Sequence, residues 1–166
     1  IFQATSDALD VHSRNVWFKS VDTAAISRMM ATLVPGINPE QALLAGLIHN
    51  VGALPVLVLA ENDDELFQDA EALGRVIYEL QGKVGELILK NWNFDDHMVE
   101  VAINCHNFSY DGHEQANIVD IVQVALLQAN HVPSEFVPEN LSDIPAVIRL
   151  GIDVDVNVID IEENKE

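Results

Sequence analysis

The chain has 166 residues, of which 49% are hydrophobic, and its formal net charge at pH 7 is −19. This length and apolar content are enough for one folded domain with a sizeable core, and they argue against a wholly disordered chain. The negative charge repels phosphate backbones and anionic lipid, so the composition argues against binding to nucleic acid or to a membrane surface.

The chain has a single cysteine, Cys105. One thiol cannot form a disulfide within the chain, which suits a reducing compartment. We find no basic start followed by an apolar run and a small-residue cleavage site, the pattern of a secretory signal peptide. These features predict a cytoplasmic protein.

The first predicted helix covers about residues 6–33, where apolar residues recur at close to helical spacing. A Val-Pro-Gly sequence ends it. A second helix start follows, with Asn38 as the N-cap and Pro39 at the first helical position. We expect this second helix to run on to about Ala60.

Residues 42–60 are almost wholly apolar, and His49 and Asn50 are their only clearly polar residues. Length alone would permit a membrane-spanning helix. The polar pair near the centre, the interruption by Pro55 and the lack of a basic flank favour a helix buried in a protein core instead. The membrane span stays as the alternative.

Residues 61–71 contain six acidic residues and no basic one. Such a run is most often a solvated surface, and acids near a helix start are favoured by the helix dipole. We predict a helix over about residues 65–80, a break at Gly82 and a further helix over residues 83–92. Four apolar residues would share one face of this last helix: Val84, Leu87, Ile88 and Trp92.

Asp95 is the predicted N-cap of a helix that ends at His106. After a polar loop, about residues 114–130 form a helix that is apolar nearly all round, which is typical of the centre of a core. Asp120 lies within this helix, and we expect it on the less buried edge.

The C-terminal part holds one more helix signal and one ambiguous stretch. Ser142 is predicted to cap a short helix that Gly151 ends. Residues 152–158 alternate between apolar and polar, as strands do, but without a partner strand we favour a final helix. No βαβ alternation, no glycine-rich phosphate loop and no serine nucleophile motif occurs, so we predict an all-α protein.

Two of the six histidines differ from the others, which we expect on the surface. His49 lies in the apolar run, and His106 follows apolar residues at spacings that place them on one inward face with it. The two imidazoles can therefore meet across the core. The residues expected to share this face with His106 are Val99, Ala102 and Ile103.

The surroundings of these histidines favour core residues bonded to backbone carbonyls over metal ligands. Divalent ions prefer several ligands, with carboxylates to offset their charge. The residues that follow the two histidines, Asn50 and Asn107, are neutral amides.

Five segments taken in order carry a resemblance to a known family. They are NVWFKSVDTAAISRMMA, AGLIHNVGALPVL, QGKVGELILKNWNF, VEVAINCHN and DIVQVALLQA. They resemble, in turn, the Trp-containing helix, the His-Asp signature helix, the Val-Gly block, the paired-histidine end and the following buried helix of the HDOD domain. This family is a bacterial signalling branch of the HD superfamily of metal-dependent phosphohydrolases.

The resemblance covers about residues 1–160 and implies an orthogonal helical bundle like that of the HD superfamily, with residues 1–166 as a single domain. It also implies further helices before the Trp-containing helix, which we expect either to be absent or to belong to a segment that precedes residue 1. Their loss would uncover apolar surface, so a homo-oligomer is an open alternative.

The resemblance further implies where the metal ligands of a catalytic HD protein would stand. The corresponding residues of this chain are Lys19, His49 with Asn50, Gln81, His106 with Asn107, and Leu126. Both carboxylates are therefore replaced, and an ammonium is added. We predict a remnant pocket lined by these polar residues, with no metal and no cofactor; if any metal binds, His49 and His106 are its ligands.

Three functions remain in view. The favoured one is a non-catalytic regulatory domain that contacts protein partners or neighbouring signalling domains, with residues 63–71 and 108–110 as candidate surfaces. The second is a metal-dependent phosphohydrolase, in which the metal would act as Lewis acid and activate water. The third is an anion or nucleotide sensor that uses the remnant pocket.

Overall fold

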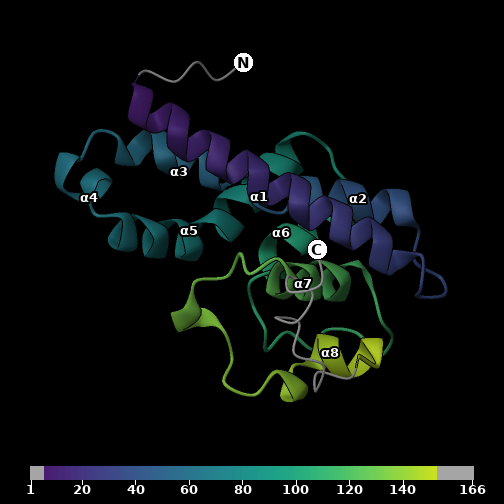
Figure 1. Cartoon of the computed structure of the whole chain (residues 1–166). Coiled ribbons are helices and arrows are strands. Elements are labelled where there is room, and N and C mark those ends of the chain that lie inside the picture. The colour runs from purple at the N-terminus through teal and green to yellow at the C-terminus, as the bar shows by residue number, and fades with distance from the viewer. Residues whose placement is uncertain (1–5, 153–166) are drawn as a thin grey trace, which may run out of the picture.

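The structure, a computed structural model, describes residues 6–152, and every regular element in that range is a helix. The longest, α1 (Asp7–Ala31), packs against α2 (Pro39–Ile48), α3 (Ala53–Ala60) and α7 (Ile118–Gln128). In Figure 1, α1 crosses the upper part of the molecule beside α2, and α7 lies below it. The predicted all-α class is confirmed.

The remaining helices extend this arrangement on two sides. Helix α4 (Asp64–Gln68) leads into α5 (Ala70–Asn91), which packs on α3 and on α6 (Asp96–Asn104). The short α8 (Pro145–Leu150) packs on α7 at the bottom of Figure 1. Two single 3₁₀ turns connect α7 to α8: η1 (Ser134–Phe136) and η2 (Leu141–Asp143).

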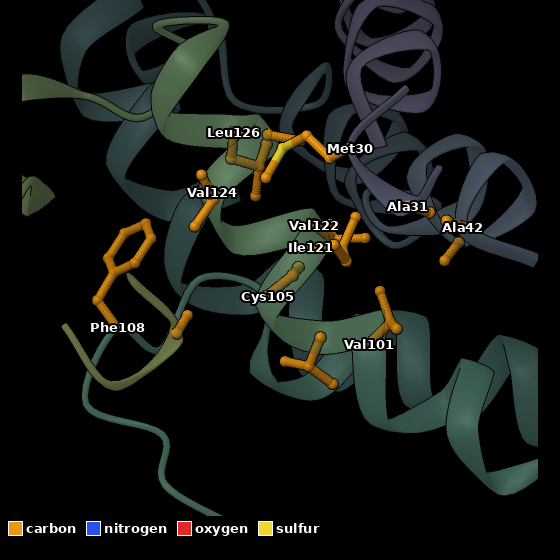
Figure 2. Packing of buried hydrophobic residues seen from close by; sticks show 14 of the residues in the cluster. Met30, Ala31, Ala42, Val101, Cys105, Phe108, Ile121, Val122, Val124 and Leu126 are labelled. Atoms are coloured by element: carbon orange, nitrogen blue, oxygen red, sulfur yellow. The ribbon is translucent and has the colours of Figure 1, made fainter. Parts of the chain in front are cut away.

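The core is built around α7, in which every residue from Val119 to Leu126 is buried. Figure 2 shows Val101, Cys105 and Met30 packed around this helix. The prediction of a central apolar helix is confirmed. Phe108, which we expected on a contact surface, is only 7% exposed and belongs to this core.

The expected helix starts are present where a side chain can accept backbone N–H groups. The Oδ1 atom of Asn38 accepts from the first turn of α2, with Pro39 at the first position. Asp95 accepts from the backbone N–H of Met98 at the start of α6. The short polar side chains therefore set these boundaries locally.

The segment from Pro39 to Ala60 is not the single helix that we expected. A turn over residues 49–52 separates α2 from α3. A Cβ atom on Gly52 would lie 2.0 Å from the carbonyl oxygen of Gln81, so this turn rests directly on the backbone of α5. The segment is long and apolar enough to cross a membrane, yet half of its most apolar window is buried inside the protein.

The predicted break at Gly82 is also wrong, because α5 continues through it. A Cβ atom there would lie 3.1 Å from the carbonyl oxygen of Ala102, so the glycine allows α5 to pack closely on α6. The face predicted to be apolar is only partly covered, with Leu87 62% and Trp92 56% exposed and the other two residues half-buried. The buried residues of α5 are instead Leu73, Gln81, Gly85 and Leu89.

The end of α6 and the setting of Asp120 differ from expectation. Helix α6 ends at Asn104, so His106 lies in the turn that follows, and Ile103 is 41% exposed. Asp120 is completely buried. Its charge is compensated there by an ion pair with Arg149 of α8, and it accepts the backbone N–H of the α7 N-cap.

Ser142 does not cap a helix as predicted. Asn140 caps η2 instead, and α8 begins at Pro145. Gly151 ends α8 in the left-handed conformation, with φ of +63°, as predicted. The helix or strand expected over residues 152–158 lies, apart from residue 152, outside the described residues.

Candidate functional site

A cavity of about 240 Å³ lies among α1, the turn after α2, α3, α5 and the ends of α6 and α7. Of the six residues predicted to form a pocket, Asn107 alone does not line it. Its side chain is exposed and accepts the backbone N–H of Ser109. Five predicted residues do line the cavity: Lys19, His49, Asn50, Gln81 and His106.

Leu126 also lines this cavity, so the position that the resemblance assigns to a carboxylate ligand faces the same space. Residues more than 100 positions apart in the chain, such as Lys19 and Leu126, therefore converge here. The convergence gives the predicted pocket a physical volume, while its use as a functional site remains a prediction.

His49 is held as a neutral imidazole. Its side chain is buried, and its Nδ1 lies 2.6 Å from the carbonyl oxygen of Gly46, to which it donates. The pKa of His49 is lowered to about 4, mainly by burial and to a smaller extent by electrostatic repulsion from His131 and Lys19. The Nδ1–H bond leaves Nε2 with a free lone pair on the cavity side, since no described residue bonds it.

His106 belongs to a chain of hydrogen bonds that fixes its tautomer. The Nε2 atom of Gln81 lies 3.4 Å from Nε2 of His106, and the amide donates. Nδ1 of His106 then carries the proton and lies 3.1 Å from the sulfur of Cys105. That thiol, whose pKa is raised by burial, donates to the carbonyl oxygen of His49 at 3.9 Å.

His106 is also neutral, and it faces His49. Its pKa is lowered to about 3, mainly by loss of hydration and to a smaller extent by electrostatic repulsion from His49 and Lys19. The ring centroids of the two histidines are 5.8 Å apart, so the imidazoles meet across the core as predicted.

Asn50 joins the turn after α2 to α1 through both atoms of its amide. Its Oδ1 accepts the hydroxyl of Ser20 at 2.7 Å, and its Nδ2 donates to the carbonyl oxygen of Val16 at 3.1 Å. A carboxylate in this place could not donate, and one of its oxygens would face the carbonyl oxygen of Val16. The geometry therefore accounts for an amide rather than an acid after His49.

Lys19 is half-buried in the wall of the cavity. Burial lowers the pKa of its ammonium, and no carboxylate of residues 6–152 lies within the 4.0 Å of an ion pair. Its charge lowers the pKa of three imidazoles: His49, His106 and His131. None of the described residues that line the cavity is an Asp or a Glu.

Sequence reasoning missed His12, Asn15, Tyr78 and His131, which also line the cavity. His12 and Asn15 precede Lys19 by seven and four residues, so helical spacing from Lys19 could have found them. His131 follows the end of α7 and carries no such signal. Its Nδ1 lies 3.4 Å from the Thr23 hydroxyl.

The side chain of Tyr78 forms part of the cavity wall and supports His106. Its hydroxyl donates to the backbone carbonyl of His106 at 3.0 Å, and its ring stacks on Phe136 with 4.0 Å between centroids. The half-buried imidazole of His106 lies between the ring of Tyr78 and the amide of Gln81 and is fixed in position, as a binding site requires.

The divalent metal implied by the resemblance does not fit the groups in this cavity. At the positions that the resemblance assigns to the metal, only His49 and His106 offer a lone pair, and that of His106 already accepts from Gln81, so the ligands there are too few for such an ion. The ammonium of Lys19 adds repulsion that no lining carboxylate offsets. Among residues 6–152, no three His, Cys, Asp or Glu side chains are grouped as metal ligands.

Comparison with known proteins gives one family and two similar structures. The family model of the HDOD domain matches residues 1–108. A structure from Shewanella amazonensis, described as "Putative metal-dependent phosphohydrolase", is 27% identical and covers 81% of this chain and 50% of its own, with a TM-score of 0.69. An HDOD domain protein of unknown function from Geobacter sulfurreducens is 21% identical, covers 82% and 52%, and has a TM-score of 0.57.

These similarities have clear bounds. Both structures have the same HD-like helical fold, which confirms the predicted bundle, and at 21% identity the second shows the fold alone. The chain spans about half the length of these two structures. No curated protein matches the chain.

Proposed function

This chain belongs to the HDOD domain family, and from that premise we propose that it is a non-catalytic regulatory domain that acts through protein contacts. Family membership and the two similar structures support a regulatory or phosphohydrolase-related domain. The choice between these two rests on the chemistry of the cavity.

The observation that carries the proposal is the set of groups that replaces the carboxylate ligands. Asn50 is committed to α1 through both of its amide atoms, and Leu126 has no polar group to offer. The ammonium of Lys19 stands in the same cavity. A metal-dependent hydrolase needs its ion to activate water and to offset charge on the phosphate, and these side chains favour neither.

A second feature supports a role in protein contacts. The outer face of α1 exposes large apolar side chains that share one side of the helix, and Trp, Phe and Met are enriched in interfaces. The exposed fractions are 65% for Val11, 60% for Trp17, 64% for Phe18, 39% for Val21 and 60% for Met29. We place the contact surface here rather than at residues 108–110.

The competing function is metal-dependent phosphoester hydrolysis. It is favoured by the likeness to the Shewanella amazonensis structure, whose description names that activity. Purified protein incubated with manganese or iron, freed of excess metal and assayed on a phosphomonoester and a phosphodiester distinguishes the two. We expect less than one bound ion per chain and no hydrolysis.

A matched pair of variants makes this experiment decisive, because an acidic surface also holds divalent ions loosely. His49→Ala removes an imidazole from the cavity, whereas His97→Ala removes an exposed one. Hydrolysis together with a stoichiometric ion that is lost in His49→Ala and kept in His97→Ala would refute the non-catalytic function.

The contact surface is tested by a photo-crosslinking residue at position 18, with position 87 of α5 as the control, since Phe18 and Leu87 are equally exposed. We expect a protein captured at position 18 only. The captured protein, once purified, should bind the wild-type domain and bind Phe18→Asp at least tenfold more weakly. Equal capture at both positions, or equal affinity for the variant, would contradict the proposed surface.

A further inference from the structure

The lining of the cavity reverses the charge of the rest of the protein. The chain contains 27 acidic and 8 basic residues, yet no acidic residue of the described part lines this cavity. Its walls carry one ammonium and four imidazoles, those of His12, His49, His106 and His131. In so acidic a chain, this is a concave surface on which an anion meets no carboxylate.

Lys19 is also the exception among the basic residues. Of the seven Lys and Arg residues within residues 6–152, six form ion pairs with carboxylates, and Lys19 forms none. The six that are paired are Arg14, Arg28, Arg75, Lys83, Lys90 and Arg149. A half-buried ammonium without a counter-ion is destabilising, and a bound anion would offset this cost.

The cavity also supplies hydrogen-bonding groups and space. Among residues 6–152, Nε2 of His49 has no partner and can accept the hydroxyl of a monoprotonated phosphate. Asn15 brings an amide donor to the same wall. A volume of about 240 Å³ is several times the ~30 Å³ that one water occupies in the liquid. A phosphate group with part of the molecule that carries it can enter such a space.

We propose that this cavity binds a phosphate group without a metal ion, with Lys19 as the counter-ion and with the amide of Asn15 and Nε2 of His49 as hydrogen-bonding partners. The inference rests on the proposed function in one respect, because it requires a cavity that holds no divalent ion. It adds to that function a small ligand through which the regulatory domain is controlled.

The test uses chelator-treated protein and three probes: inorganic phosphate, adenosine monophosphate, and sodium chloride at matched ionic strength. We expect phosphate or the monophosphate, in the millimolar range, to raise Tm by about 2–5 °C over chloride. The histidine ring signals in NMR spectra should shift in the same titration. Inorganic phosphate alone would indicate a free-anion site, and a larger effect of the nucleotide would indicate that the rest of the ligand adds contacts.

Two lysine variants identify the site. Lys19→Met removes the cavity charge, whereas Lys90→Met removes an exposed charge on α5. We expect Lys19→Met to abolish the phosphate-dependent rise in Tm and Lys90→Met to keep it. No rise in wild type beyond that with chloride, or an equal rise in Lys19→Met, would overturn the inference.

The outcome also separates this inference from the proposed function. A phosphate effect that appears only after manganese or iron is added, together with hydrolysis, would overturn both. Absence of any phosphate effect in protein that neither holds metal nor hydrolyses phosphoesters would overturn the phosphate site alone and leave the regulatory domain standing.

Discussion

The side chains of Arg149 and Lys19 are both at least partly buried, but their surroundings differ: acids surround Arg149, whereas imidazoles and amides surround Lys19. The side chain of Arg149 is 8% exposed and makes two hydrogen bonds to Asp120, at 2.9 and 2.7 Å. It also bonds Asp111 and the backbone carbonyls of Tyr110 and His113. Among the described residues Lys19 has no such partner, and it shares its cavity with the neutral imidazoles of His49 and His106.

The pKa values record this contrast. The hydrogen bonds of Asp120 raise the pKa of Arg149, whereas burial lowers the pKa of Lys19. A cation matched by a bidentate carboxylate holds α8 to α7 and serves the fold. Lys19 has no such carboxylate within residues 6–152, and in our proposal its charge is available to a ligand.

The largest effect is expected from removing Arg149, the cation whose charge is compensated by Asp120. Arg149→Met leaves the fully buried Asp120 without a counter-ion, and we expect a loss of about 3–5 kcal/mol in the free energy of unfolding. Urea denaturation near neutral pH measures it. The matched control is Arg28→Met, because Arg28 pairs with Glu40 on the surface and should contribute less than about 1 kcal/mol.

A double variant shows whether the lost stability comes from the orphaned carboxylate. Adding Asp120→Leu to Arg149→Met removes both charges, so part of the loss should be recovered. If Arg149→Met were no more costly than Arg28→Met, the buried pair would not hold α8, and the contrast with Lys19 would lose its first half.

The imidazoles beside Lys19 give the next largest effect, and it depends on pH. The pKa of His49 in the folded state, about 4, lies below its ordinary 6.5, so the unfolded chain takes up the proton first as the pH falls. The contribution of neutral His49 to stability is therefore complete above about pH 6.5 and declines towards pH 4. The expected decline is about 3 kcal/mol.

His49→Asn isolates this effect from the titration of the many acids. The asparagine amide can keep the bond to Gly46 but does not titrate, so wild type should lose more stability on acidification than the variant does. His97→Asn, at an exposed position, is the control and should follow wild type. Parallel stability curves for wild type and His49→Asn between pH 7 and about pH 4 would show that His49 is not held neutral.

Much of the fold followed from local signals. The caps at Asn38 and Asp95 and the all-round apolar pattern of α7 each act over a few residues, and each was predicted. The helix breaks were predicted wrongly in two ways: Gly82 was expected to end a helix that continues through it, and the turn at Gly52 was not expected. Both glycines allow a close approach to the backbone of another helix, which local sequence does not show.

The site was predictable in part for a similar reason. Helix spacing and the family resemblance brought His49, His106 and Lys19 together, and they share one cavity. The partner of Asp120 lies 29 residues away, and nothing local announces it, so Asp120 was wrongly placed on an exposed edge. His131 was missed because it follows a helix end and reaches the cavity only through tertiary packing.

A carboxylate introduced into the cavity tests directly whether Lys19 can pair with an acid there, as Arg149 does with Asp120. Asn50→Asp replaces the amide that donates to the carbonyl oxygen of Val16 with a group that cannot donate when ionised. We expect a loss of about 1–3 kcal/mol near neutral pH, smaller in acid, where the new carboxyl is protonated. The control is Asn62→Asp, since Asn62 is exposed and also donates to backbone carbonyls. A loss no larger than that of the control would mean that Lys19 compensates the new acid.

The smallest expected effect is that of removing Lys19, and it tests most directly how this cation differs from Arg149. Without phosphate, Lys19→Met should raise the free energy of unfolding, because the variant removes a charge that loses hydration on folding. The gain should be less than about 1 kcal/mol, since the half-buried ammonium keeps part of its hydration. The lowered pKa means that the charged form is disfavoured by folding, so the gain persists at neutral pH and fades as the pH approaches the ordinary pKa near 10.5.

Lys90→Met, which loses a surface bond to Glu86, should show no such gain. A destabilised Lys19→Met would mean that the ammonium has a structural role, like Arg149, and the contrast between the two cations would fail. In saturating phosphate the sign of the Lys19→Met effect should reverse, because wild type then gains stability from a ligand that the variant does not bind. A cation that serves ligand binding alone should lower the free energy of unfolding when the ligand is absent and raise it when the ligand is bound.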